Sequence, residues 1–144
     1  MIYYVYSDGA YSRERKTGAW SYLIYTDKTF IAWESNKCDY IKTPTYAEDI
    51  AVGLACYELM TKHNLTKRDK VIIHSDSLST ITMMQRILKN EDVHINNILV
   101  KDSIDNIRKL SEITRIDFSK VRSHKSTLNP NICVDRMAKI FLRS

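Results

Sequence analysis

Four acidic residues lie where carboxylates could bind metal ions: Asp8, Glu48, Asp76 and Asp135. Asp8 and Asp76 end two short runs, IYYVYSD and VIIHSD, whose β-branched and aromatic residues are typical of strands. Glu48 and Asp135 fall inside segments with helical periodicity. Carboxylates that converge raise each other's pKa, and burial adds to that cost unless cations compensate it. If these acids meet, we therefore expect them to hold divalent ions, of which Mg²⁺ prefers carboxylate, water and phosphate oxygens.

The two acids at strand ends also have ordinary structural interpretations. Asp8-Gly9 is a favoured turn signal, and Asp76 or Ser77 could cap the helix that follows. The next strand begins well beyond Gly9, however, which excludes a two-residue hairpin turn at Asp8. In open α/β sheets, ligands gather at the carboxyl ends of parallel strands. Asp8 and Asp76 would meet there if their strands are parallel neighbours.

The two acids inside helices have structural alternatives as well. Thr45-x-x-Glu48 has the spacing of a capping box, but Glu48 also shares a helical face with the apolar residue Val52. A carboxylate on an apolar face is costly unless a positive group compensates it. Asp135 could be a surface acid paired with Lys139, four residues later. Each acid alone is ambiguous, and their order along the chain carries more weight than any one of them.

The elements that must position these acids alternate between strand and helix patterns. Strands are expected over Ile2–Asp8, Gly18–Thr26, Thr29–Ser35, Val71–Asp76 and Ile113–Val121, and helices over about Thr45–Lys62, Ser77–Lys89, His94–Leu110 and Pro130–Leu142. Three consecutive strands predict an antiparallel meander, and the later strands are joined by helical crossovers. The order predicts an α/β fold with a mixed sheet covered by helices, in a single domain over residues 1–144.

Composition favours a nucleic-acid partner. The chain of 144 residues carries a formal net charge of +5 and has a pI near 9.1, and basic side chains that neutralise phosphates release counterions. Three cysteines at wide spacing form neither a disulfide framework nor a zinc motif, which predicts buried or half-buried thiols in a reducing compartment. No membrane span or signal peptide is predicted. We expect a cytoplasmic monomer.

Five segments in order resemble type I of the ribonuclease H family over nearly the whole chain. They are Ser7-Asp8-Gly9-Ala10, the strand from Gly18 to Ile24, Ala47-Glu48, Ile73-His74-Ser75-Asp76-Ser77, and Ser123-His124 followed by Asn131 to Ala138. The resemblance implies a five-stranded mixed sheet in the order 3-2-1-4-5, flanked by helices. It also implies an endonuclease that hydrolyses the RNA strand of RNA–DNA hybrids.

The resemblance further implies a two-metal-ion mechanism, in which an activated water attacks the phosphodiester in line. Asp8 would bridge two Mg²⁺ ions, which Mn²⁺ could replace, while Asp76 would hold one and Glu48 and Asp135 the other. His124 would help protonate the leaving group or release the product. The expected contacts to the nucleic-acid backbone are Thr43, Arg122, Lys125 and Arg15.

Departures from the family pattern concern the substrate rather than the acids. Thr43-Pro44-Thr45-Tyr46 replaces a segment that usually carries Asn, Gln or Arg, and Leu78 replaces a common Gln. Two alternatives therefore stay open: a DNA nuclease of the same fold, such as a junction resolvase or transposase-type domain, and a non-catalytic nucleic-acid-binding module.

Overall fold

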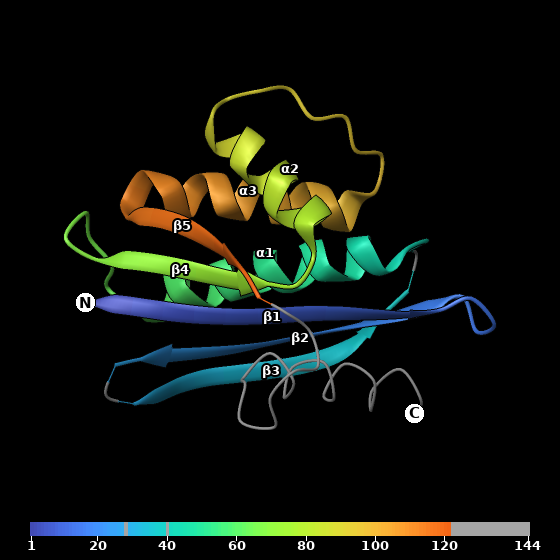
Figure 1. Ribbon diagram of the computed structural model, residues 1–144, viewed down its shortest axis with the longest axis horizontal. Helices are drawn as coiled ribbons and strands as arrows, with labels where there is room; N and C mark the ends of the chain where they lie inside the picture. Colours follow the sequence, from blue (N-terminus) through green and yellow to red (C-terminus); the bar gives the residue numbers. More distant parts are fainter. Residues whose placement is uncertain (28, 40, 122–144) are drawn as a thin grey trace.

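The computed structural model describes residues 1–27, 29–39 and 41–121. Its sheet has five strands in the order β3-β2-β1-β4-β5, which confirms the predicted order. The strands are β1 (Ile2–Ser12), β2 (Thr17–Thr26), β3 (Phe30–Cys38), β4 (Lys70–Ser75) and β5 (Arg115–Lys120). β1, β2 and β3 form the antiparallel meander, whereas β4 pairs in parallel with both β1 and β5. β1 is thus the strand at which the sheet changes from antiparallel to parallel pairing (Figure 1).

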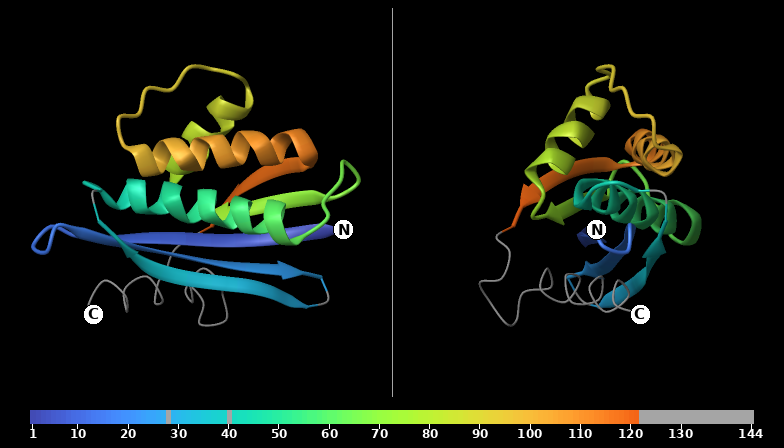
Figure 2. Two further views of the ribbon diagram at one scale, coloured as in Figure 1. Left: turned by 180° about the vertical axis from the view of Figure 1, so that it is seen from behind. Right: turned by 90° about the vertical axis from the view of Figure 1, so that its right-hand side faces the viewer.

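Three helices, α1 (Pro44–Lys62), α2 (Leu78–Leu88) and α3 (Ile98–Ile113), lie on the same side of the sheet (Figure 2). α1 packs against β1 and β2, and α3 packs against α1. α1 is buried on most sides, because apolar residues lie on more than one of its faces, although Tyr57 is exposed. The expected helix over 130–142 lies outside the described residues. None of the described helices is long and apolar enough to cross a membrane.

The core lies between the sheet and α1. Val5, Ile24 and Ile73 come from three adjacent strands and are fully buried, and Val52 and Leu59 meet them from α1. Cys38 and Cys56 are buried free thiols, as predicted, and burial raises the pKa of the Cys56 thiol to about 12. Cys133 lies outside the described residues.

Several predicted boundaries are wrong, and one of the two largest errors concerns the end of β1. Asp8-Gly9 does not stop this strand, because Gly9, Ala10 and Tyr11 continue its pairing with β2 as far as Ser12. The backbone turns only at residues 13–16, where Lys16 takes a positive φ of 53°. Asp8 therefore lies within the hairpin ladder rather than in a turn.

Helix starts also differ from prediction. α1 begins at Pro44, with Thr43 as N-cap and its hydroxyl accepting from the Tyr46 amide at 3.2 Å, so the capping box from Thr45 to Glu48 does not form. Proline favours the first helical position because it needs no amide partner there. α3 begins four residues later than expected, because Asn97 accepts from the Leu99 and Val100 amides.

Candidate metal centre

The register between β1 and β4 brings Asp8 and Asp76 side by side. Tyr6 of β1 pairs with His74 of β4, and Asp8 and Asp76 each follow two residues later. The two rings stack with centroids 4.4 Å apart and planes 9° apart. Strand pairing between β1 and β4 ends at this pair. Beyond this pair, β1 continues beside β2, whereas the segment after His74 leads through Ser75 and Asp76 into α2.

α1 supplies the third acid, Glu48, from its first turns. The helix approaches β1 closely at Gly9, where an added Cβ atom would overlap the backbone nitrogen of Glu48. This contact needs the smallest residue in the strand for space, since Gly9 does not have a positive φ. Gly9 therefore lets α1 bring Glu48 down to the strand that carries Asp8.

Two serine hydroxyls hold the Glu48 carboxylate. Ser75 Oγ donates to Glu48 Oε1 at 2.6 Å, and Ser7 Oγ donates to the same oxygen at 2.9 Å. These lengths are typical of charge-assisted O–H···O⁻ hydrogen bonds. The other oxygen, Glu48 Oε2, is buried and has no hydrogen-bond donor among the described residues.

Asp8, Glu48 and Asp76 each offer one carboxylate oxygen, and these atoms lie within 4.8 Å of one another. Asp8 and Glu48 are buried, and Asp76 is partly exposed. Two oxygens on one Mg²⁺ ion can lie up to about 4.2 Å apart, so small side-chain movements would bring the three atoms to a single ion. The oxygen set and its spacing fit a hard divalent cation.

The electrostatics of Glu48 point the same way. Burial raises the pKa of this carboxyl group most strongly, and the negative charge of Asp76 raises it further. Hydrogen bonds from Ser75 and Ser7 and the close Asp8 carboxyl group lower it, but the net pKa remains above its ordinary value. A divalent cation would reverse this balance, because it favours the ionised form of every carboxylate around it.

A fourth described acid, Asp49, lies beside the cluster on α1, and the sequence interpretation did not single it out. It is buried, and its Oδ1 atom has no hydrogen-bond partner. Burial raises its pKa to about 7, with a further contribution from Glu48. The Thr80 hydroxyl of α2 lies near enough to lower this pKa, but its Oγ1 makes no hydrogen bond of ordinary geometry.

The remaining predicted site residues fall into two groups. Thr43 and Arg15 are exposed, the first as the N-cap of α1 and the second in the turn between β1 and β2. These two segments lie at the same end of the molecule (Figure 1). The four others lie outside the described residues: Arg122, His124, Lys125 and Asp135.

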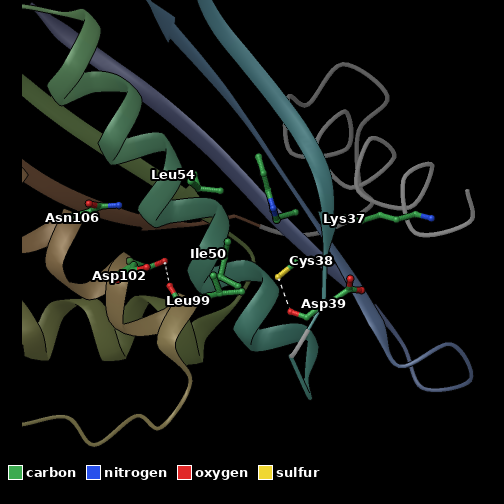
Figure 3. A pocket seen from close by; sticks show the side chains of 10 residues that line it. Lys37, Cys38, Asp39, Ile50, Leu54, Leu99, Asp102 and Asn106 are labelled. Carbon is green, nitrogen blue, oxygen red and sulfur yellow. Dashed lines mark hydrogen bonds between the residues drawn. The ribbon is translucent and has the colours of Figure 1, made fainter.

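A pocket of about 350 Å³ lies apart from the three acids, between the end of β3, α1 and α3 (Figure 3). Trp20, Ile50 and Leu99 contribute apolar walls, and Asp39 and Asp102 add carboxylates. None of Asp8, Glu48 and Asp76 lines this pocket. The three acids lie instead at the end of the β1–β4 pair.

The sequence interpretation quoted Ser7 and Ser75 within motifs but gave them no role. A signal was present, since each serine directly precedes one of the strand acids, in Ser7-Asp8 and Ser75-Asp76. Side chains alternate across a strand, so a residue next to an outward acid points to the opposite face. On that face lies α1, which carries Glu48.

Comparisons with known proteins agree with this fold. The RNase H family model matches residues 2–142. The N-terminal RNase H domain of a Mycobacterium tuberculosis protein, solved as a fusion with maltose-binding protein, has a TM-score of 0.73 at 13% identity, covering 99% of this chain and 94% of that one. RNase H1 of Halobacterium salinarum has a TM-score of 0.70 at 16% identity, covering 99% and 98%. No curated protein sequence matches the chain.

The fold and the acidic cluster define a nuclease of the ribonuclease H type. The chain belongs to the RNase H family, whose members depend on divalent metal ions and hydrolyse the RNA strand of RNA–DNA hybrids.

Proposed function

We propose that the chain is an Mg²⁺-dependent ribonuclease H that cleaves the RNA strand of RNA–DNA hybrids with two ions. The observation that carries the proposal is the convergence of Asp8, Glu48 and Asp76, with ligand atoms within 4.8 Å, in a member of this family. Asp135 is proposed as the fourth ligand from its place in the sequence. Such ions supply Lewis-acid stabilisation and a more acidic bound water.

Each of the proposed site residues would have its own role in the reaction. Asp8 would contribute to both ions from β1, and Glu48 and Asp76 would contribute ligands from α1 and the end of β4. His124 is proposed as the group that moves a proton at the leaving oxygen, because imidazole titrates near neutral pH. The burial of Glu48 limits its contact with bulk water.

Substrate binding is proposed to rest on the phosphate backbone. Arg15 is exposed in the β1–β2 turn, and Thr43 caps the start of α1 at the same end of the molecule. Arg122 and Lys125 would add cationic contacts from the segment after β5. Contacts to phosphate fix register and orientation without reading sequence, so little base preference is expected.

Cleavage assays with Mg²⁺ test the proposal directly. End-labelled RNA–DNA hybrid, duplex DNA and a four-way DNA junction are each incubated with the wild-type chain and with Asp76→Asn. We expect metal-dependent cleavage of the RNA strand alone, and none by the variant. Cleavage of DNA but not of the hybrid would contradict the substrate, and wild-type activity of Asp76→Asn would contradict the metal site.

A further inference from the structure

The Glu48 carboxylate is hydrogen-bonded on one side only. Both of its hydroxyl donors, Ser7 and Ser75, bind Oε1, and Oε2 is left without a donor among the described residues. A buried carboxylate normally satisfies both oxygens, since an unpaired buried oxygen keeps its full desolvation cost. The asymmetry therefore leaves one oxygen available for a cation, next to Asp8 and Asp76.

The geometry fixes which way the Ser75 proton points. Ser75 Oγ accepts a hydrogen bond from the Ser77 backbone nitrogen at 3.0 Å, and Ser77 is the N-cap of α2. With one lone pair engaged there, the single hydroxyl proton is directed to Glu48. The turn into α2 thus orients a donor that acts on α1.

Ser7 supplies the second donor from β1. Its hydroxyl has two possible acceptors, Glu48 Oε1 at 2.9 Å and the His74 carbonyl at 3.5 Å, and the shorter contact is to the charged group. Ser7 and Ser75 are both fully buried, so water does not compete for these protons. The two hydroxyls approach Glu48 from neighbouring strands and restrict rotation of its carboxylate.

We propose that Ser7 and Ser75 are positioning residues that clamp Oε1 of Glu48 and so present Oε2 to the metal. This inference rests on the proposed function, in which Glu48 is a metal ligand. Neither serine needs to touch the ion or the substrate. Groups that orient metal ligands in this way commonly change metal affinity by about 10-fold or more when removed.

The test measures metal binding without nucleic acid. Mn²⁺ is titrated into the full chain, and free Mn²⁺ is followed by its electron paramagnetic resonance signal. We expect Ser75→Ala to weaken binding by about 10-fold. Ser75→Thr keeps the hydroxyl and should bind as the wild type does. The matched control is Ser103→Ala, because Ser103 is a buried serine whose hydroxyl donates to the Leu99 carbonyl in α3.

Cleavage kinetics give a second readout. With Ser75→Ala, the Mg²⁺ concentration for half-maximal rate should rise, whereas kcat at saturating Mg²⁺ should stay near the wild-type value. A merely structural defect would lower activity at every metal concentration. Should Ser75→Ala fail to fold, Ser7→Ala, which retains the shorter of the two hydrogen bonds, serves in its place with a smaller expected loss.

Glu48→Gln distinguishes a failure of the proposed serine role from a failure of the proposed metal site. If Glu48→Gln loses Mn²⁺ affinity while Ser7→Ala and Ser75→Ala bind normally, the positioning role is overturned and the metal site stands. If Glu48→Gln itself binds Mn²⁺ as the wild type does, the assignment of Glu48 as a ligand is overturned.

Discussion

A Cβ atom on Gly9 would lie 2.6 Å from the carbonyl carbon of Ala47. This close approach of β1 and α1 sets the position of Glu48, the residue after Ala47, relative to Asp8, the residue before Gly9. Backbone atoms on both sides cannot move aside as a flexible side chain could. The spacing of the two acids therefore depends on the absence of a side chain at one strand position.

Gly9→Ala should displace α1 from β1 and weaken both folding and metal binding. Overpacking of this kind typically costs about 1–3 kcal/mol of unfolding free energy, and the shift should also separate Glu48 from Asp8. Urea denaturation and Mn²⁺ titration measure the two effects. Gly18→Ala is the matched control, because its Cβ would meet mainly the flexible side chain of Ile41. Equal losses in both variants would contradict a special role for Gly9.

Asp8→Asn should abolish cleavage while the protein remains folded. The carboxylates repel one another without metal, so removing one negative charge should leave the metal-free melting temperature unchanged or higher. Mg²⁺ should raise the melting temperature of the wild type, because a ligand that binds only the folded state stabilises it, and this rise should be smaller in the variant. Differential scanning calorimetry with EDTA and with Mg²⁺ tests this. The same metal-induced rise in both proteins would argue against Asp8 as a ligand.

Asp49→Asn should stabilise the metal-free protein, and increasingly so as pH rises. Burial raises the pKa of Asp49 from 3.8 to about 7, so the folded state binds this proton more tightly than the unfolded state does. The stability that the protonated group supports is present below pH 3.8 and is lost as pH rises through 7. The full shift corresponds to about 4 kcal/mol at most.

Urea unfolding in EDTA at about pH 4 to 8 compares the unfolding free energies of the wild type and Asp49→Asn over the pH range of this shift. Glu48 titrates in both of them, so the difference between the curves reports Asp49 together with its electrostatic coupling to Glu48. Parallel curves across this range would show that Asp49 titrates normally.

Gly53→Ala should destabilise the protein although alanine is the better helix former. In an exposed helix interior this change stabilises by about 1 kcal/mol. Here an added Cβ would overlap Ser103 of α3, where Asn106 also donates to the Gly53 carbonyl at 3.1 Å. In a double-mutant cycle, adding Ser103→Gly to Gly53→Ala should restore part of the lost stability. Additive effects in the cycle would mean that the helix contact does not limit position 53.

Arg15→Ala should weaken hybrid binding without affecting the metal site. If Arg15 contacts one phosphate, binding should fall for every sequence alike, and the slope of log affinity against log salt should decrease by about 1. Fluorescence anisotropy in Ca²⁺ or EDTA measures binding without turnover. Lys109→Ala is the control, since Lys109 is an exposed cation on α3. An unchanged salt slope would remove Arg15 from the contact surface.

The element types and the order of the acids were determined by the sequence itself. Alternating and β-branched runs such as Val71–Asp76 specify strands locally, and the apolar periodicity around Val52 specifies a buried helix. Local chemistry also determines where a helix begins, but neighbouring residues can compete for the capping position. Thr43 rather than Thr45 caps α1, because Pro44 suits the first helical position.

Only the tertiary structure decided how the acids are held. The clamp on Glu48 joins residues 41 and 27 positions apart in the chain, through Ser7 and Ser75. Those contacts require the parallel register of Tyr6 with His74 and the close approach of α1 at Gly9. Neither is encoded in a local pattern, since strand register and helix docking depend on how the whole core packs. The sequence thus supplied the acids, and long-range packing supplied their orientation.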